Sequence, residues 1–266
     1  MLRTYLVDGD KGGVGKSLTA RALVHYHLTL EAGSRPVIAV VDADMSNPDV
    51  CGKEGLSTKN SSALQATQIL DLSVEQGWID FSNVLDNLQK QHEDEEIRVI
   101  VNMPAQIGAR AFQGTVPIVG EVLRQAHAFP IWLLSRVEDA IRTLEERIKA
   151  MPGRFQNGLI LRNLFFGESD KFTRWENSPL RAKLLNLGDE SEFHWDENRL
   201  PEINAGVIDT VGRHPFHVAL GEDGGRPLLT HGQRLTLKAW LHTTHEVFAQ
   251  MESFIARAEK ADAEHA

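Results

Sequence analysis

Short apolar runs recur along the chain, and stretches of helical periodicity separate them. Most of the runs are apolar at nearly every position, which is typical of parallel strands that are buried on both faces. They predict strands at Thr4–Asp8, Val37–Asp42, Ile97–Asn102, Pro130–Ser135 and Gly158–Asn163. A further short strand is expected at Glu192–Trp195.

The segments between these runs place apolar residues at helical spacing. Leu18, Ala22, Tyr26 and Leu30 follow one another in steps of four, and Gly33 then stops the helix. We expect helices over 17–30, 81–91 and 137–151, and one long or two short helices over about 233–260. Because no repeat or break in composition interrupts this alternation, it predicts one α/β domain over residues 1–266. The sheet is expected to be doubly wound, mostly parallel and flanked by helices.

The composition fits a protein with a sizeable apolar core. Of the 266 residues, 42% are hydrophobic, and the single cysteine, Cys51, has no partner for a disulfide within the chain. The sequence enters a strand-like run at once and contains no stretch of the roughly 20 apolar residues that a membrane span requires. We therefore expect a cytoplasmic protein that makes no membrane contact.

The charge balance argues against a general affinity for nucleic acid. The chain carries 37 acidic and 28 basic residues, a formal net charge of −9, which repels DNA and anionic membranes at long range. Residues 136–183 have a small excess of bases, but a solvated helix face accounts for this segment better than a DNA-binding surface. Direct contact with DNA therefore has weak support.

The stretch GDKGGVGKS, Gly9–Ser17, lies between the first predicted strand and the first predicted helix. Backbone amides of Gly12, Gly13, Val14 and Gly15 can converge on phosphate oxygens there, and the helix adds its own free amides and the positive end of its dipole. Lys16 is suited to reach the β- and γ-phosphates, and the Ser17 hydroxyl to bind Mg²⁺. The ordinary phosphate-loop pattern nevertheless fails at Asp10, which stands where its first glycine belongs.

Written as K-G-G-V-G-K-S, the loop resembles the deviant Walker A motif of the ParA/MinD family of P-loop ATPases. In that family the residue before the first lysine varies, so the resemblance accommodates Asp10. The resemblance implies that Lys11 reaches across a nucleotide-sandwiched dimer to the phosphates of the partner subunit. It also implies ATP and Mg²⁺ as cofactors and a homodimer that forms on ATP binding.

The second predicted strand ends in V-V-D-A-D, where the family has a D-x-D pair. An acid at the carboxyl end of a central parallel strand faces the crevice where phosphates and Mg²⁺ bind. The resemblance implies that Asp42 lies by the metal shell and that Asp44 positions the attacking water. Ser46, Asn47 and Pro48 follow as a loop suited to respond to the γ-phosphate.

The strand at 97–102 ends in N-M-P, where family members usually have an aspartate that holds Mg²⁺ through water. Asn102 keeps an oxygen ligand but lacks the negative charge, so we expect weaker metal binding and slow or partner-stimulated hydrolysis. Gly108 is a candidate hinge for the loop that follows.

Two residues late in the chain are candidates for binding the base. The resemblance implies that Asn163, at the end of its strand, hydrogen-bonds the adenine edge and that Pro201 packs against the ring. A helix-capping asparagine and an ordinary loop proline are alternative interpretations. Leu18, next to Ser17, completes the predicted nucleotide-binding set.

The final helix carries one apolar stripe: Val247, Met251, Phe254, Ile255 and Ala258. Acidic residues flank the stripe, which is the wrong sign for a helix that grips an anionic membrane. We therefore expect this helix to pack against the body of the protein or against a partner.

Three functions agree with these observations. The favoured hypothesis is a ParA-like ATPase that acts as a nucleotide-dependent dimerising switch and has a protein partner, either an adaptor or a DNA-binding protein. Arg162–Leu185 resembles the corresponding stretch of ParA-like proteins encoded with plasmid mobilisation and conjugative-transfer functions, which favours plasmid partition, stability or transfer. The alternatives are an ATP-dependent small-molecule ligase or kinase, with residues 45–80 available for a substrate pocket, and a nucleotide-binding regulator that scarcely hydrolyses.

Overall fold

The fold is a seven-stranded sheet in which every strand pair is parallel. We describe a computed structural model, which covers residues 1–59, 61–104, 117–150, 155–187 and 192–265, the last five without their side chains. The strands are β1 (Leu2–Gly9), β2 (Val37–Asp42), β3 (Leu64–Ile69), β4 (Ile97–Asn102), β5 (Ala128–Leu134), β6 (Asn157–Asn163) and β7 (His194–Leu200). Their order is β3-β2-β4-β1-β5-β6-β7. The predicted doubly wound α/β class is confirmed.

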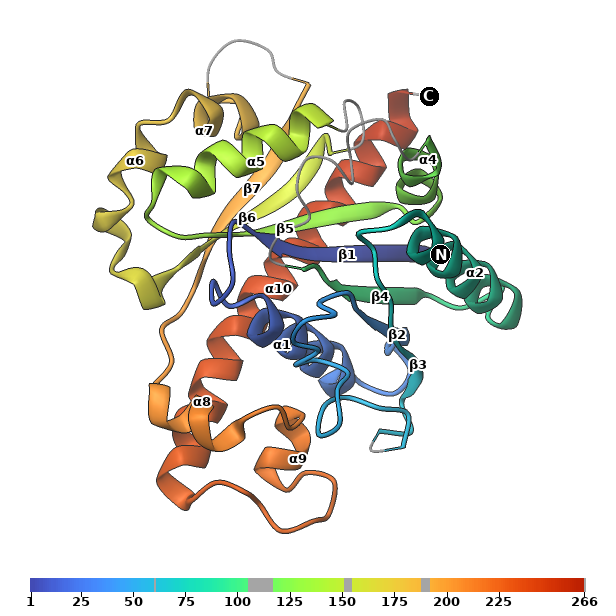
Figure 1. Cartoon of the computed structure of the whole chain (residues 1–266), viewed down its shortest axis with the longest axis vertical. Helices are drawn as coiled ribbons and strands as arrows, with labels where there is room; N and C mark the ends of the chain where they lie inside the picture. Colours follow the sequence, from blue (N-terminus) through green and yellow to red (C-terminus); the bar gives the residue numbers. More distant parts are fainter. Residues whose placement is uncertain (60, 105–116, 151–154, 188–191, 266) are drawn as a thin grey trace.

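Helices cover both faces of this sheet (Figure 1). They are α1 (Lys16–Thr29), α2 (Glu75–Gln91), α4 (Pro117–Gln125), α5 (Glu138–Ala150), α6 (Thr173–Glu176), α7 (Pro179–Leu184), α8 (Ala205–Val211), α9 (Phe216–Leu220) and α10 (His231–His265). Two short 3₁₀ turns, η1 (Leu164–Phe166) and η2 (Ser169–Lys171), follow β6. Side chains of α2 and α4–α7 pack in one apolar cluster, and those of α1 and α8–α10 pack in the other.

The two clusters explain why the central strands are apolar at nearly every position. In β4, Val99 and Val101 belong to the first cluster, whereas Ile100 between them belongs to the second. Successive side chains of a strand point to opposite faces, and here each face is covered by helices. A central strand with helices on both faces therefore needs apolar side chains at nearly every position and not an alternation of apolar and polar residues.

The sequence pattern fails at the two edges of the sheet. The edge strand β3 was not predicted, and the opposite edge strand β7 runs from His194 to Leu200 instead of over Glu192–Trp195. Both strands carry polar residues because an edge is only partly covered, and so they lack the continuous apolar signal. The predicted helix at 81–91 begins earlier, at Glu75, and buries Trp78 in its first turns. The expected helix end at Met151 lies outside the described residues.

The C-terminal helix α10 is one long helix that crosses one face of the sheet (red in Figure 1) and contacts α1 and β7. Val247, Met251 and Ile255 of its apolar stripe are buried in the second cluster, which confirms that the helix packs against the body. Among the described residues, no helix is both long and apolar enough to cross a bilayer.

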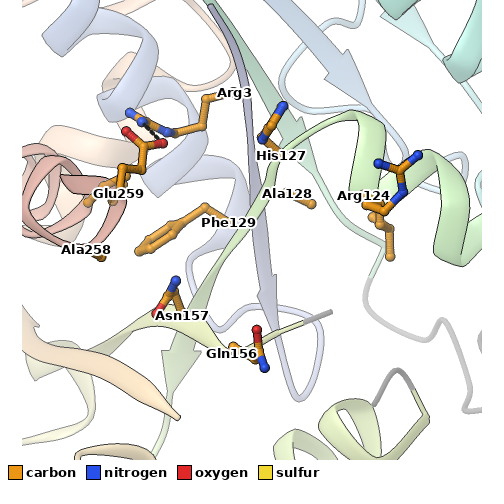
Figure 2. Close-up of a pocket in the computed structure, with 11 residues that line it drawn as sticks. Arg3, Arg124, His127, Ala128, Phe129, Gln156, Asn157, Ala258 and Glu259 are labelled. Carbon is orange, nitrogen blue, oxygen red and sulfur yellow. Dashed lines mark hydrogen bonds and ion pairs between the residues drawn. The ribbon is translucent and has the colours of Figure 1, made fainter. Parts of the chain in front are cut away.

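A buried charge network joins α10 to the amino ends of the strands. The Glu252 carboxylate accepts hydrogen bonds from the Arg3 guanidinium (3.2 Å) and the Tyr5 hydroxyl, and Arg98 Nε lies 3.9 Å away. Arg3 also pairs with Glu259, and Figure 2 shows this contact beside a cavity of about 250 Å³ at the same end of the sheet. Glu252, one of the acidic residues that flank the apolar stripe, therefore fastens the helix.

A buried histidine completes this network. His27, at the end of α1, lies with Nε2 3.7 Å from a Glu252 oxygen, a distance that would suit an ion pair. Burial nevertheless lowers the pKa of His27 to about 3, and the positive charges of Arg98 and Arg3 add to this shift. His27 is therefore neutral in the folded protein at ordinary pH.

Candidate nucleotide-binding site

The glycine-rich loop joins β1 to α1 in the geometry that a phosphate cradle needs. Gly13 and Gly15 have φ angles of 77° and 102°, a region that favours glycine, and Gly15 is the N-cap of α1. A Cβ on Gly15 would lie 2.9 Å from the Asn163 amide nitrogen, and one on Gly9 would lie 2.7 Å from Val14. The loop therefore needs glycine for both its conformation and its close packing, and its backbone amides stay accessible to a ligand.

A cavity of about 610 Å³ opens beside this loop, at the carboxyl ends of β1, β2, β6 and β7. This is the edge at which open parallel sheets bind ligands, and the volume lies within the range of small-molecule sites. The predicted residues that line it are Gly12, Gly13, Gly15, Lys16, Ser17, Leu18, Asp44, Asn163 and Pro201. The fold thus brings together residues that are far apart in the sequence.

Lys16 is positioned inside the cradle. Its side chain is only 6% exposed, and its ammonium group donates a hydrogen bond to the Lys11 carbonyl oxygen at 3.1 Å. Burial lowers the pKa of Lys16, and the nearby carboxylates of Asp8, Asp44 and Asp10 partly oppose the shift. A partly desolvated ammonium group bound to a loop carbonyl is ready to exchange that contact for a phosphate oxygen.

Lys11 has a different environment. Its side chain is exposed, is not among those that line the cavity, and lies over the Phe166 ring with Nζ 5.6 Å from the ring centroid. The two lysines of the motif therefore point to different places, Lys16 into its own cavity and Lys11 outside it.

Oxygen donors gather on the other side of the loop. Asp42, fully buried at the end of β2, accepts a hydrogen bond from the Asn102 amide nitrogen at 2.8 Å and from the backbone nitrogens of Val50 and Cys51. The same Asn102 nitrogen lies 3.5 Å from the Ser17 hydroxyl oxygen. Asp42 and Asn102 therefore meet at adjacent strand ends, and Ser17 reaches them from the first turn of α1; of the three, only Ser17 is among the residues that line the cavity.

This cluster fits a magnesium ion in its chemistry. The side-chain amide oxygen of Asn102 is buried and has no hydrogen-bond partner among the described residues, whereas its amide nitrogen faces Asp42 and Ser17. Mg²⁺ prefers oxygen ligands and usually retains several waters beside one or two carboxylates. Asp42 is the one carboxylate among these three residues, so the site carries less negative charge than a pair of acids would. Asn102 is uncharged and therefore hydrogen-bonds Asp42 without electrostatic repulsion.

Asp44 lies on the cavity wall in the loop that follows β2. Its carboxylate accepts hydrogen bonds from the Ser46 hydroxyl (2.7 Å) and the Asn47 backbone nitrogen (3.2 Å). Arg213, after α8, bonds both Asn47 and Asp49 and so ties this loop to the far wall. The orienting role of Asp44 toward a water molecule stays a prediction.

Asn163 ties the end of β6 to the loop. Its amide nitrogen donates to the Val14 carbonyl oxygen at 2.8 Å, and its amide oxygen accepts from the Phe165 backbone nitrogen at 3.0 Å. The capping interpretation of Asn163 is therefore confirmed, because this second bond caps η1. Pro201 lines the cavity while its carbonyl oxygen accepts from the Trp240 indole. Contact of either residue with a base stays a prediction.

Asp10, the residue that breaks the ordinary pattern, turns toward the end of β5. One of its carboxylate oxygens accepts from the Ser135 hydroxyl at 3.3 Å, and the other is buried without a partner among the described residues. Burial raises the pKa of Asp10, and the nearby Lys11 charge is the largest opposing influence. Asp10 does not line the cavity, so the acid is kept out of the cradle. Gly108, the candidate hinge, lies outside the described residues.

Sequence reasoning missed the apolar half of the cavity. Phe165, which is 57% exposed, lines the cavity together with four aliphatic residues: Leu200, Ile203, Ala205 and Ile208. They flank Asn163 and Pro201, the two residues that the resemblance did select. The apolar residues next to Asn163 and Pro201 in the sequence were the signal from which this part of the lining could have been predicted.

The chain is similar to Protein MobD of Acidithiobacillus ferrooxidans. The two are 29% identical over 248 residues, which is 91% of this chain and 95% of that protein. No protein-family model matches the chain.

Two solved structures with low sequence identity are also similar. The MinD cell division protein of Aquifex aeolicus has a TM-score of 0.46 at 14% identity, with 93% of this chain and 97% of that chain covered. The 54 kDa signal recognition particle protein of Aeropyrum pernix K1, solved in complex with GDP, has a TM-score of 0.42 at 14% identity, with 98% of this chain and 50% of that chain covered. The fold assignment accordingly depends on the strand order and the loop, and not on these superpositions.

The resemblance to ParA/MinD ATPases is confirmed at the level of the fold. The glycine-rich loop with Lys11 joins β1 to α1, which begins at Lys16, and β1 lies centrally in an all-parallel sheet. Asp42 ends β2 and Asp44 follows it. This is the P-loop NTPase arrangement, in which a nucleotide binds at the loop.

Proposed function

We propose that this protein is an ATPase that acts as a nucleotide-dependent dimerising switch. The observation that carries the proposal is the separation of the two lysines of the loop. Lys16 is enclosed in the cradle, whereas Lys11 extends outside its own cavity, where a second subunit can meet it. A lysine that served only its own nucleotide would be expected to line the cavity.

The proposed chemistry is transfer of the γ-phosphoryl group to water. The loop amides and Lys16 bind the phosphates, and Lys11 of the partner subunit adds a second positive charge where negative charge develops. Ser17, Asp42 and Asn102 are the residues that would hold Mg²⁺, which supplies charge neutralisation on the phosphate oxygens. Asp44 positions the attacking water.

Asn102 supports a slow or partner-stimulated enzyme. An asparagine in place of an acid reduces the negative charge beside the metal, and so we expect weak Mg²⁺ binding and a low basal rate. An enzyme of this kind with the lowest hydrolysis rate would be the regulator that binds nucleotide and scarcely hydrolyses it. Turnover measured on the pure protein, with and without DNA, separates the two.

The small-molecule ligase or kinase has less support. Of the described residues in 45–80, only Ser46, Asn47 and Asp49 line the cavity, and all three lie in the loop directly after β2. A substrate pocket built from this region would be expected to draw on more of it. A hydrolysis rate that stays at background until a small metabolite is added would favour this alternative.

We further propose a role in plasmid partition, stability or conjugative transfer, in the cytoplasm and with a protein partner. The likeness to Protein MobD, which extends over most of both chains, and the resemblance of the 162–185 segment support this role. The single cysteine suits a reducing compartment, and burial raises the pKa of Cys51 to about 12, so that its thiol stays protonated. Direct DNA binding remains weakly supported.

Calorimetry and sedimentation together test the proposal. We expect wild-type protein to bind ATP in the presence of Mg²⁺ more tightly than GTP, and to dimerise with a slowly hydrolysed ATP analogue. Lys11→Ala is expected to retain nucleotide binding and lose this dimerisation. Absence of affinity for any adenine or guanine nucleotide would refute the proposal, and an equal loss of nucleotide affinity in the Lys11 and Lys16 variants would refute the role given to Lys11.

A further inference from the structure

The contact between Lys11 and Phe166 is specific in its geometry. The ammonium nitrogen of Lys11 lies 5.6 Å from the ring centroid, within the distance of about 6 Å at which a cation is attracted to an aromatic face. Lys11 is exposed and has no ion pair among the described residues; its ammonium group lies against the ring, and its charge also acts on the neighbouring Asp10 carboxylate.

The turn that carries Phe166 is fastened to the loop that carries Lys11. Asn163 bonds the Val14 carbonyl oxygen with its amide nitrogen and caps η1 with its amide oxygen. Gly15 allows this approach, since a Cβ there would lie 2.9 Å from the same amide nitrogen. The distance between the η1 turn and the loop is therefore fixed by two hydrogen bonds from one buried side chain.

Two consecutive aromatic residues in η1 face different surroundings. Phe165 lines the nucleotide cavity, whereas Phe166 packs against the second apolar cluster and lies under Lys11. The two rings meet edge to face, with centroids 5.4 Å apart and planes at 88°. Phe166 is thereby held from two sides while its face is presented to the lysine.

We propose that Phe166 is a positioning residue that holds Lys11 outside its own cavity, ready for the phosphates bound by a second subunit. The inference rests on the proposed dimerising switch. It adds the residue that orders Lys11, the lysine that would reach the partner subunit. A lysine side chain loses much rotamer freedom when it is fixed in one place. The Phe166 ring orders this side chain before the subunits meet, and so less freedom is lost on dimerisation.

Replacing Phe166 by leucine or tyrosine tests the proposal. Phe166→Leu keeps an apolar side chain but removes the aromatic face, whereas Phe166→Tyr keeps the face. With the slowly hydrolysed ATP analogue and Mg²⁺, sedimentation is expected to show dimerisation two- to fivefold weaker in the leucine variant and unchanged in the tyrosine variant. This range corresponds to the roughly 0.5–1 kcal/mol of an exposed cation–π contact.

Phe165→Leu is the matched control, because it alters the same turn without removing the ring that Lys11 contacts. It is expected to change nucleotide affinity and to spare dimerisation at saturating nucleotide. Phe166→Leu is expected to do the reverse, with nucleotide affinity unchanged when it is measured at protein concentrations below those at which dimers form.

Lys11→Ala, which is expected to lose dimerisation, is the reference for the pair. Normal dimerisation of Phe166→Leu under conditions in which Lys11→Ala abolishes it overturns the inference and leaves the proposed switch intact. If the wild-type protein binds nucleotide and never dimerises, the proposed switch itself is refuted, and the role of Phe166 with it.

Discussion

The two ends of the parallel sheet differ in how their buried polar groups are paired. At the amino ends, the Glu252 carboxylate meets Arg3, Tyr5 and Arg98, so that charges compensate one another within the chain. At the carboxyl ends, the side-chain amide oxygen of Asn102 is buried without a partner among the described residues, and the Lys16 ammonium group donates to a loop carbonyl. The charged groups at the amino end pair within the chain, whereas polar groups at the carboxyl end line a cavity that has room for a ligand.

This difference follows from the direction of the strands. The carboxyl ends of parallel strands receive the N-termini of the following helices, which offer free backbone amides to an anion. The amino ends have no such donors, and there the chain uses α10 to bring carboxylates to buried arginines. We therefore expect substitutions at one end to change ligand binding and substitutions at the other to change stability.

The largest expected effect belongs to Lys16→Ala. Loss of the charged phosphate contact is expected to weaken nucleotide binding at least a thousandfold, or about 4 kcal/mol, in calorimetry. Because burial already disfavours the charged form of Lys16, the free energy of unfolding without nucleotide should not decrease. Lys90→Ala, on the exposed face of α2, is the control and should bind nucleotide normally. Retained affinity in Lys16→Ala would place the phosphates elsewhere.

Glu252→Ala is expected to have the opposite profile. Removing the shared carboxylate leaves Arg3 and Arg98 buried with less compensation, and the free energy of unfolding should fall by about 3 kcal/mol in urea titrations. Nucleotide affinity should be unchanged, since the network lies at the far end of the sheet. Glu246→Ala removes an exposed acid of the same helix and should change stability by less than about 0.5 kcal/mol. Similar losses in the two variants would contradict the structural role of the network.

We expect acidic pH to lower the free energy of unfolding through His27, at the amino end of the sheet. Its folded-state pKa of about 3 lies below the value of about 6.5 in an unfolded chain, so the unfolded state binds the proton more readily. The contribution of neutral His27 is therefore complete above pH 6.5 and is lost as the pH falls toward 3. Between pH 6.5 and 5 we expect a loss of about 2 kcal/mol from this residue.

The variant His27→Gln should remove this part of the acid dependence. The wild-type protein will keep a further contribution from His245, whose pKa burial lowers to about 4, so the difference between the two curves is the quantity to measure. Identical acid dependence in wild type and His27→Gln would show that folding leaves the pKa of His27 unchanged.

The smallest expected effect belongs to Asn102→Asp, which adds a second carboxylate to the ligand end. We expect about tenfold tighter Mg²⁺ binding in the presence of nucleotide and faster hydrolysis. Without metal, the new carboxylate would face Asp42 where the amide now donates a hydrogen bond, so stability should fall by about 1–2 kcal/mol. An unchanged or lower hydrolysis rate would mean that the metal is already well held.

Sequence patterns located the elements that are central to the fold. The strands at Val37–Asp42 and Ile97–Asn102 were predicted with their observed ends, because strands covered on both faces must be continuously apolar. The edge strands β3 and β7 gave weak signals, and the short helices α6–α9 gave none, since a few residues do not establish a period. The glycine-rich loop was located from its glycine and lysine spacing together with its resemblance to the deviant Walker A motif.

What the sequence by itself determined is therefore the local chemistry: a loop that only glycines can form, a strand pattern that only a covered parallel sheet explains, and acids at strand ends. What only the tertiary structure decided is which distant residues meet. Asn163 contacts Val14, Phe166 lies under Lys11, and Glu252 reaches Arg3 because the sheet order and the path of α10 bring them together. Local spacing fixes dihedral angles and periodicity, whereas such contacts arise from the packing of whole elements, which no short stretch of sequence encodes.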